Sequence, residues 1–442
     1  MLIVDIFKRA GIMGTFLNSI PAVFRILIIF AIILLMIKAK WNLGNAFLTG
    51  GLGLGFIFGL NPWEIVEAST AALLYIKTIS LAMVVSLILV LSHSLEKSGQ
   101  MQRLLSCFEG LSAKPKLNLV IFPALIGLLP MPGGAIFSAP MVKTIGKSQH
   151  LSAQKLSYIN YWFRHIWEYW WPLYPGILLT ITLAKVDLWR MIFFLLPLTI
   201  VAVIAGYWPL RGSIIHKMSL NATTTVKAFL FEAIPILFAI ICGLGLGQFC
   251  SYYLPVRWHA VDKEVGLILA LLISIGWVYG QNQMTVSTLK RIVLSPALLK
   301  MVYMVSAIMV FKGVLEKSGA VILISDEMLQ WHIPLAPITM VLPFLVGVVT
   351  GITIAFVGAT FPILISLIHS LDQGRFLLAY LMLALVSGFA GVLISPLHLC
   401  LLLSNQYFKT TLIPVYRLMR FPILTLIGSG ILYFWGLRLI FA

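Results

Sequence analysis

Three ionisable residues lie close together in an apolar stretch of the chain: Arg164, His165 and Glu168. Inside a membrane such side chains are costly, so they mark binding sites, ion pathways or proton relays. On a continuous helix, Arg164 and Glu168 share one face and can form an ion pair near the inner interface. Alternatively, Arg164 or His165 binds an anionic substrate and Glu168 holds or relays a proton. The aromatic residues between Tyr158 and Tyr174 are expected to form an interface belt.

A second candidate is His398, which follows Pro396 in the sequence SPLH at residues 395–398. Its imidazole can titrate near neutral pH. Proline removes a helical hydrogen-bond donor and frees a carbonyl group that a cation can use. Pro172 interrupts the fourth span in the same way, and an ordinary kink or a satisfied core residue remains the alternative at each position. For Glu232, the other embedded acid, a position at the membrane interface is the better interpretation.

The sequence does not contain the motifs of metalloenzymes or of ATP-driven pumps. The eight histidines are scattered without a metal-binding spacing such as HExxH, and no GxxxxGKS loop for ATP is present. The four cysteines form no CxxC pair and are interpreted as packing residues. We therefore predict a protein that is not an enzyme, uses no cofactor and has no metal site.

The composition is that of a polytopic membrane protein. Of the 442 residues, 60% are hydrophobic and only 10% are charged, whereas soluble domains contain about 45–50% apolar and about 25% charged residues. The net charge of +17 would indicate nucleic-acid binding in a soluble protein. In a membrane protein it reflects cytoplasmic loops rich in Lys and Arg, so nucleic acid is not an expected partner.

Ten segments are apolar enough to cross a bilayer, and two more are apolar but interrupted. The predicted spans are residues 21–38, 43–60, 70–93, 156–180, 189–208, 228–250, 264–280, 297–315, 376–403 and 413–440. Residues 117–147 and 334–368 are too long for one crossing and too short for two, and Pro or Gly breaks each of them centrally. We expect both to fold back as re-entrant hairpins, which requires that protein or water cover the break.

An internal repeat relates the two interrupted segments. The sequence LEKSG at residues 95–99 recurs at residues 315–319, an offset of 220 residues. Further identities stand at the same offset: Pro123 and Pro343, Gly127 and Gly347, and Ala135 and Ala355. Because this offset is nearly half of the chain length, duplication is the better explanation.

The distribution of Lys and Arg predicts the orientation of the repeats. With both interrupted segments as hairpins, the inside loops hold 17 Lys and Arg residues and the outside holds 9. If each segment crossed once, the split would be 14 against 12, so the positive-inside rule favours hairpins. Each half then has five spans, an odd number, and the halves are inverted.

The predicted fold class is therefore an all-α polytopic membrane protein with two inverted-topology repeats, each of about five transmembrane helices and one re-entrant hairpin. The first repeat is residues 1–210, with the hairpin at 117–147. Residues 211–227 form a cytoplasmic linker. The second repeat is residues 228–442, with the hairpin at 334–368.

Two sequence runs resemble a known family: FPALIGLLPMPGGAIFSAPMV at residues 122–142 and SPLHLC at residues 395–400. They are similar to an uncharacterised bacterial and archaeal integral-membrane family, a domain of unknown function within the ion-transporter superfamily. That superfamily contains gluconate, citrate, dicarboxylate and arsenite carriers and some sodium/proton antiporters. The resemblance covers nearly the whole chain and implies two inverted repeats whose hairpins and broken helices meet at the substrate site. The Ser-Asn-Thr hairpin signature of the sodium/dicarboxylate branch is missing.

The resemblance implies a binding site at the two hairpin tips and the two helix breaks. The candidate residues are Pro130, Met131, Pro132, Gly133, Gly134 and Ser138 in the first hairpin, Thr350, Gly351, Thr353, Gly358 and Thr360 in the second, and Pro172, Ser395, Pro396 and His398 at the breaks. Arg164, His165 and Glu168 lie just ahead of the first break and complete the set.

These features predict a secondary active transporter. Two halves of opposite orientation form inward-open and outward-open states of similar energy, and paired broken segments mark the binding site. Neither embedded acid lies at a hairpin tip, which favours a small anionic solute (an organic acid or oxyanion) coupled to H⁺ or Na⁺. The alternatives are a cation/proton antiporter and, outside transport, an intramembrane enzyme or an assembly factor.

The expected partners are the anion, the coupling cation and the lipid bilayer of the cell (inner) membrane. A homodimer is compatible with this organisation. The identity of the solute is not encoded in any pattern that we recognise.

Overall fold

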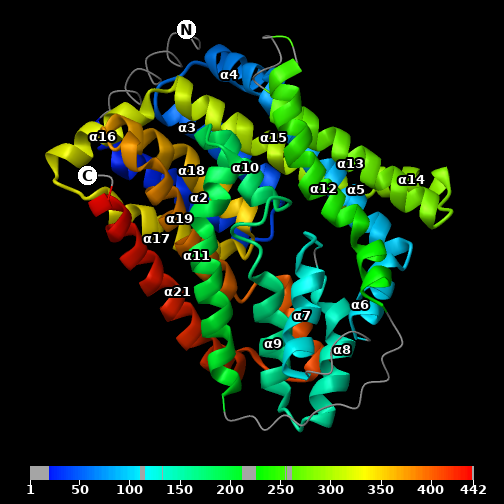
Figure 1. The fold of residues 1–442 in the computed structure, drawn as a ribbon. Coiled ribbons are helices and arrows are strands. Elements are labelled where there is room, and N and C mark those ends of the chain that lie inside the picture. Colours follow the sequence, from blue (N-terminus) through cyan, green and yellow to red (C-terminus); the bar gives the residue numbers. More distant parts are fainter. Residues whose placement is uncertain are drawn as a thin grey trace.

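The computed structural model describes residues 19–109, 115–131, 133–211, 225–253, 255 and 261–440. Within them every regular element is a helix (Figure 1), so the all-α prediction is confirmed. Pro132 and residues 212–224 of the predicted linker lie outside the described residues.

The order of long and short helices is the same in both halves of the chain. The first half contains α2 (Ala22–Lys38), α3 (Leu43–Ile57), α4 (Pro62–Leu74), α5 (Ile76–Lys97), α6 (Gln100–Glu109), α7 (Pro115–Gly127), α8 (Ala135–Ser148), α9 (Ala153–His165), α10 (Pro175–Ala184) and α11 (Leu188–Tyr207). The second half contains α12 (Val226–Tyr253), α13 (Asp262–Gln281), α14 (Val286–Val293), α15 (Pro296–Lys317), α16 (Ala320–Gln330), α17 (Leu335–Thr350), α18 (Thr353–Ser370), α19 (Leu377–Ile394), α20 (Leu399–Phe408) and α21 (Leu412–Ile440).

Eight stretches of the described residues are long and apolar enough to cross a membrane, and the chain is a multi-pass membrane protein. They contain α5, α11, α12, α13, α15, α18, α19 together with α20, and α21. The predicted spans differ in two respects: α2 and α3 have only 17 and 15 residues, and α18 is long enough to cross alone. The predicted interruption of the fourth span is confirmed, since it is divided into α9 and α10. The short helices α4, α6, α14 and α16 were not predicted, because each lies between apolar segments that dominate the pattern.

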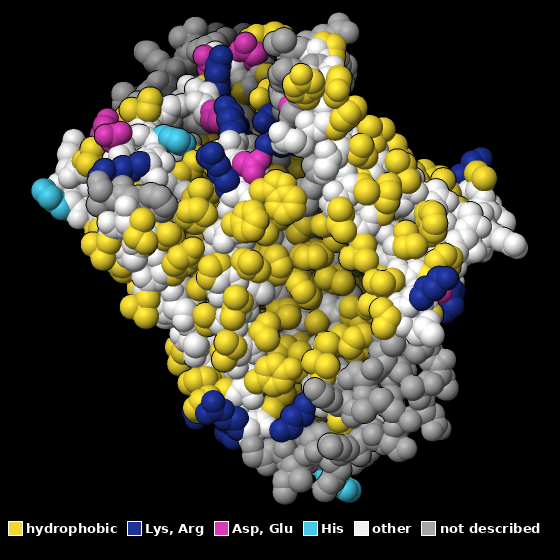
Figure 2. All heavy atoms as spheres, viewed as in Figure 1, with side chains coloured by type: hydrophobic (Ala, Val, Ile, Leu, Met, Phe, Trp, Pro, Cys, Tyr) yellow, Lys and Arg dark blue, Asp and Glu magenta, His cyan; other side chains and the backbone are white. Residues whose placement is uncertain are grey.

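The surface has the character expected of a protein in a bilayer. Figure 2 shows apolar side chains over the middle of one face, Lys and Arg at its lower edge, and charges of both signs at its upper edge. Large apolar side chains on α11 and α21, such as Ile204 and Leu432, are exposed. Exposure of that kind indicates contact with lipid.

The repeated LEKSG sequence ends α5 and α15 in the same way. Gly99 and Gly319 have φ of +71° and +65°, a left-handed conformation that glycine adopts at little cost. The Oγ atoms of Ser98 and Ser318 donate to the leucine carbonyl three residues earlier and accept from the second amide that follows. The motif is therefore a helix-ending turn that leads into α6 in the first half and α16 in the second.

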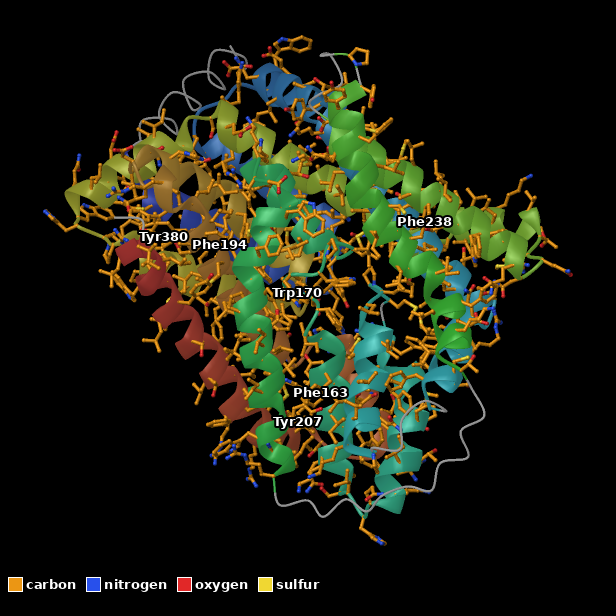
Figure 3. All side chains as sticks on the ribbon, in the orientation of Figure 1. Phe163, Trp170, Phe194, Tyr207, Phe238 and Tyr380 are labelled. Atoms are coloured by element: carbon orange, nitrogen blue, oxygen red, sulfur yellow. The ribbon has the colours of Figure 1, made fainter. Side chains whose placement is uncertain are left out.

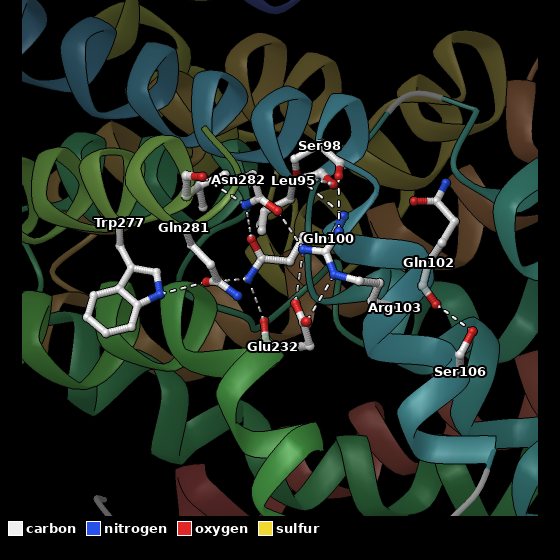
Figure 4. A network of polar contacts seen from close by, with 11 residues as sticks. Leu95, Ser98, Gln100, Gln102, Arg103, Ser106, Glu232, Trp277, Gln281 and Asn282 are labelled. Atoms are coloured by element: carbon white, nitrogen blue, oxygen red, sulfur yellow. Dashed lines mark hydrogen bonds and ion pairs between the residues drawn. The ribbon is translucent and has the colours of Figure 1, made fainter. Parts of the chain in front are cut away.

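A polar network joins the first of these turns to α12 and α13 (Figure 4). Arg103 forms an ion pair with Glu232, with 3.0 Å between Nε and Oε1, and also donates to Asn282. Gln100 donates to the carbonyl of Glu232 at 3.1 Å and accepts from Asn282 at 2.9 Å. Because Glu232 is paired with a half-exposed arginine, its position suits an interface better than a proton relay.

Helices of the two halves pack in reciprocal pairs. α3 of the first half contacts α15 of the second, and the equivalent pair, α5 and α13, is also in contact. In the same way α8 contacts α20, and α10 contacts α18. α11 and α21, the last helices of the two halves, contact each other. The interrupted segment of each half therefore packs on the second part of the broken helix of the other half. This packing brings the four interruptions together.

Two glycines at equivalent positions allow this close packing. A Cβ on Gly127 would lie 2.1 Å from the carbonyl oxygen of Arg164, and one on Gly347 would lie 2.3 Å from that of Gly388. Neither space can hold a side chain, so α7 packs directly on α9 and α17 on α19.

We predict that Gly347→Ala lowers the free energy of unfolding by about 1–3 kcal/mol, because the added methyl group must separate two packed helices. Gly428→Ala on α21 is the control, since a Cβ there meets nothing within 4 Å. Denaturant titration of the purified protein measures both. Equal stability of the two variants would contradict the prediction.

Candidate functional site

A cavity of about 610 Å³ lies where the four interruptions meet. The interruptions are residues 128–134, 166–174, 351–352 and 395–398, which separate α7 from α8, α9 from α10, α17 from α18 and α19 from α20. Each of them contributes residues to the cavity wall. The site is thus made by all four breaks and by both halves of the chain.

Four helices begin at this cavity: α3 at Leu43, α10 at Pro175, α18 at Thr353 and α20 at Leu399. Gly133, just ahead of α8, lines the wall as well. The N-terminus of a helix carries partial positive charge and unpaired amide groups, which together favour an anion. Several such ends at one cavity therefore make it favourable for negative charge.

Arg164, in the last turn of α9, is the only buried guanidinium among the described residues at this cavity. Its Nη2 donates to the carbonyl oxygen of Met131 at 2.5 Å, and its Nη1 lies 3.2 Å from Nε2 of His165. Gly134 makes room for it, because a Cβ there would lie 2.5 Å from Nη2. Within the described part of the chain no carboxylate lies at ion-pair distance, so a buried positive charge faces the cavity.

Of the two alternatives for Arg164 and Glu168, the ion pair along one helix face does not form in the described structure. α9 ends at His165, so the two side chains do not share a helix face. Glu168 instead accepts a hydrogen bond of 2.6 Å from Oγ1 of Thr353 on α18, and its Oε2 lies 4.0 Å from Nε2 of His165. The break in the helix turns the carboxylate toward the other half of the protein.

His165 and His398 meet across the two halves. Their Nε2 atoms are 3.0 Å apart and their rings are nearly perpendicular, at 82°. Nδ1 of His165 lies 2.6 Å from the carbonyl oxygen of Tyr161. A carbonyl can only accept, so Nδ1 carries the proton and Nε2 of His165 accepts from Arg164 and from His398.

Residues 21–435 match a family described as "Protein of unknown function (DUF401)". The chain belongs to the DUF401 family. This membership agrees with the expected uncharacterised membrane family, while the link to the ion-transporter superfamily stays a prediction. A search of curated proteins finds no match. For this DUF401 protein the function therefore has to be argued from the site.

The cavity of this DUF401 protein brings together about half of the predicted site residues. Those that line it are Pro130, Met131, Gly133, Arg164, His165, Glu168, Gly351, Thr353 and His398. Gly134 lies beside it, against Arg164. Ser138, Pro172, Thr350, Gly358, Thr360, Ser395 and Pro396 are not part of the lining.

Several residues outside the lining have structural partners. The hydroxyls of Thr350 and Thr360 donate to carbonyls one turn earlier in their own helices, both at 2.8 Å. Gly358 provides close contact with Ile308 on α15. Oγ of Ser395 accepts from the amide of Leu397 at 3.2 Å and thereby satisfies a backbone group at the break.

Sequence reasoning missed the remaining residues of the cavity wall, among them the polar residues Lys40, Lys300 and Cys400. Cys400 was interpreted as a packing residue, and its only local signal is its place two residues after His398. Lys40 and Lys300 are exposed and lie in the turn after α2 and on α15, elements that no motif connects to the site.

The aromatic residues around the break between α9 and α10 do not form an interface belt. Tyr158, Tyr161 and Trp162 are at most 2% exposed, because α7, α8, α20 and α21 surround α9. Figure 3 shows Phe163 beside Tyr207, with ring centres 5.4 Å apart. These side chains hold the broken span in the protein core.

A buried polar network fixes α8 against α9 and α20. Ser138 donates to Oδ1 of Asn160 at 2.6 Å, and Nδ2 of Asn160 donates to Oγ of Ser404 at 2.6 Å and to the carbonyl of Ala135 at 2.9 Å. The three side chains are fully buried. Ser138 thus positions the first interrupted segment and does not face the cavity.

We predict that Ser138→Ala lowers the free energy of unfolding by about 1–3 kcal/mol, because it leaves a buried amide oxygen without a donor. Ser106→Ala, on the exposed side of α6, should change stability by less than about 0.5 kcal/mol. Thermal unfolding in detergent compares the two variants. A stable Ser138→Ala protein would show that the network does not fix α8.

Proposed function

We propose that this protein is a secondary active transporter that carries a small anionic solute across the cell membrane by alternating access. One observation carries the proposal: the buried Arg164 faces a cavity at which several helices begin. A buried charge without an ion-pair partner is costly, and an anionic ligand would remove that cost. In this proposal the chain is a carrier and not an enzyme.

The charge and size of the cavity support a small anion. Its basic lining residues are Lys40, Arg164 and Lys300, and its one acidic lining residue is Glu168. A volume of about 610 Å³ lies in the usual range of small-molecule sites, roughly 300–1,000 Å³. We therefore propose an organic acid or an oxyanion as the solute.

Helix boundaries support a duplicated chain. α5 and α15 begin and end exactly 220 residues apart, and α10 and α20 begin and end 224 residues apart. α10 and α20 also end in the same way, at Lys185 and Lys409, both with left-handed backbone (φ +53° and +55°). We propose residues 1–210 and 228–442 as the two repeats, joined by residues 211–227.

The reciprocal packing supports an inverted arrangement of these repeats. In the proposal, α7 with α8 and α17 with α18 are the two re-entrant hairpins, and each half adds five spans. The span that contains α18 is 83% buried within the protein, which is the covering that a hairpin inside a membrane requires. The ion-transporter scaffold implied by the sequence resemblance has this same organisation.

The coupling ion in the proposal is H⁺ or Na⁺. His165, His398 and Glu168 offer proton-binding groups at the contact between the halves. The carbonyl groups freed at the breaks offer oxygen ligands for Na⁺. Either ion would bind beside the anion, which is the arrangement that links the two fluxes.

Uptake into proteoliposomes tests the transport proposal. We expect a panel of radiolabelled carboxylates and oxyanions to include one that accumulates under a pH or Na⁺ gradient. Arg164→Met should weaken solute affinity roughly thirty-fold or more, which corresponds to about 2 kcal/mol. Arg164→Lys should have a smaller effect, because it keeps the charge and loses the planar fork of donors.

Arg291→Met, on the exposed helix α14, is the control and should transport like the unchanged protein. Thermal unfolding of each variant separates loss of binding from loss of fold. Absence of flux for every anion, with and without a gradient, would contradict anion transport. Dye quenching in vesicles after addition of Na⁺ would then identify a cation/proton antiporter.

Cysteine labelling tests the inverted repeats. In a protein with all four native cysteines replaced by serine, we introduce Lys97→Cys or Lys317→Cys, both at exposed positions at the end of an LEKSG helix. A membrane-impermeant maleimide applied to intact cells should label only the Lys317→Cys protein. Labelling of both positions, or of neither, before the cells are opened would overturn the inverted topology.

A further inference from the structure

Three metal-ligating side chains meet at the cavity: His165, His398 and Cys400. Their ligand atoms, one imidazole nitrogen from each histidine and the cysteine sulfur, lie within 4.8 Å of one another. All three side chains are at least nine-tenths buried. His165 comes from the end of α9 in the first half of the chain, whereas His398 and Cys400 come from the start of α20 in the second.

The spacing of these atoms suits Zn²⁺. Zinc binds imidazole nitrogen at about 2.0–2.1 Å and thiolate sulfur at about 2.3 Å, so tetrahedral ligand atoms lie roughly 3.3–3.6 Å apart. The two Nε2 atoms are 3.0 Å apart. Small rotations of the two rings, with the proton of His398 moved from Nε2 to Nδ1, would therefore place both nitrogens and the sulfur around one ion.

The hydrogen bond on the far side of His165 favours metal binding. Its Nδ1–H donates to the carbonyl of Tyr161 at 2.6 Å, which leaves the Nε2 lone pair directed at His398. Histidines that bind metals are usually held by such a bond from the other ring nitrogen to a carbonyl or carboxylate. The ring is thus already in the tautomer that a metal ligand needs.

Glu168 supplies a fourth ligand. Its Oε2 lies 4.0 Å from Nε2 of His165, and its side chain is 12% exposed. A carboxylate and a thiolate together balance the two charges of Zn²⁺. Arg164 would give up its contact with His165 on metal binding and keep its hydrogen bond to the carbonyl of Met131.

An ion can reach this cluster from outside. His165, His398, Cys400 and Glu168 all line the cavity, whose wall also includes the exposed Lys40. We propose that these four residues form a Zn²⁺ site that joins the two halves of the protein. A Zn²⁺ ion would occupy the same His165, His398 and Glu168 that the proposed function assigns to proton binding, whereas the test below measures metal binding and not transport.

Metal binding to the purified, tag-free protein tests the proposal. Equilibrium dialysis should give one Zn²⁺ per chain. Co²⁺, which replaces Zn²⁺ in such sites, should produce strong visible absorption of a tetrahedral ion and a near-ultraviolet thiolate-to-cobalt band, and Zn²⁺ should remove both. Cys400→Ser should abolish the thiolate band, and His398→Gln should weaken Zn²⁺ binding by more than about ten-fold.

Cys242→Ser, on α12 and outside the cavity, is the matched control and should bind both ions unchanged. Thermal unfolding checks that each variant is folded, and the spectrum of the unchanged protein decides the question even if a variant is not. A Co²⁺ spectrum without the thiolate band, or Zn²⁺ binding that survives Cys400→Ser, would overturn the proposal. Neither result depends on whether the protein transports a solute.

Discussion

Backbone groups that leave a helix inside a membrane have no water to bind, so protein must cover them. Four interruptions impose this constraint here, and the packing of the protein meets it. Tyr174 at the second break donates to the carbonyl of Gly127 at the end of α7, and Arg164 donates to that of Met131. Thr350 accepts from the amide of Ile352. Hydrogen bonds from Tyr174 and Arg164 to the first break, and a local bond at the third, thus satisfy backbone groups where the four breaks meet at the cavity.

The two halves are similar in backbone and different in chemistry. Gly127 packs against the carbonyl oxygen of Arg164, and Gly347 packs in the same way against the carbonyl oxygen of Gly388. The position of Arg164 in the first half is therefore occupied by a glycine in the second. Tyr174 and His398 likewise occupy corresponding places at the two breaks. Two halves of similar backbone thus hold a single charged site, as the proposed transport of one solute at a time requires.

The proposed anion site and the proposed metal site share the same contact between the halves. His165 accepts from Arg164 and from His398, so any ligand of Arg164 or of the histidines changes the interface between α9 and α20. Glu168 joins that interface to α18 through Thr353. In the proposed transporter, a bound ligand would therefore contact directly the elements that alternating access moves relative to one another.

The sequence by itself determined the helical class, the membrane location, the offset of the repeat and the positions of the four breaks, because hydropathy, Pro and Gly act through local structure. It also pointed to Arg164, His165, Glu168 and His398, since ionisable residues in apolar stretches are conspicuous. Only the tertiary structure decided which partners they have. The pairing of His165 with His398 and Cys400 joins residues more than 230 positions apart, and the loss of the Arg164–Glu168 pair depends on the residue at which α9 ends. Such contacts arise from packing between distant elements, and no local pattern encodes them.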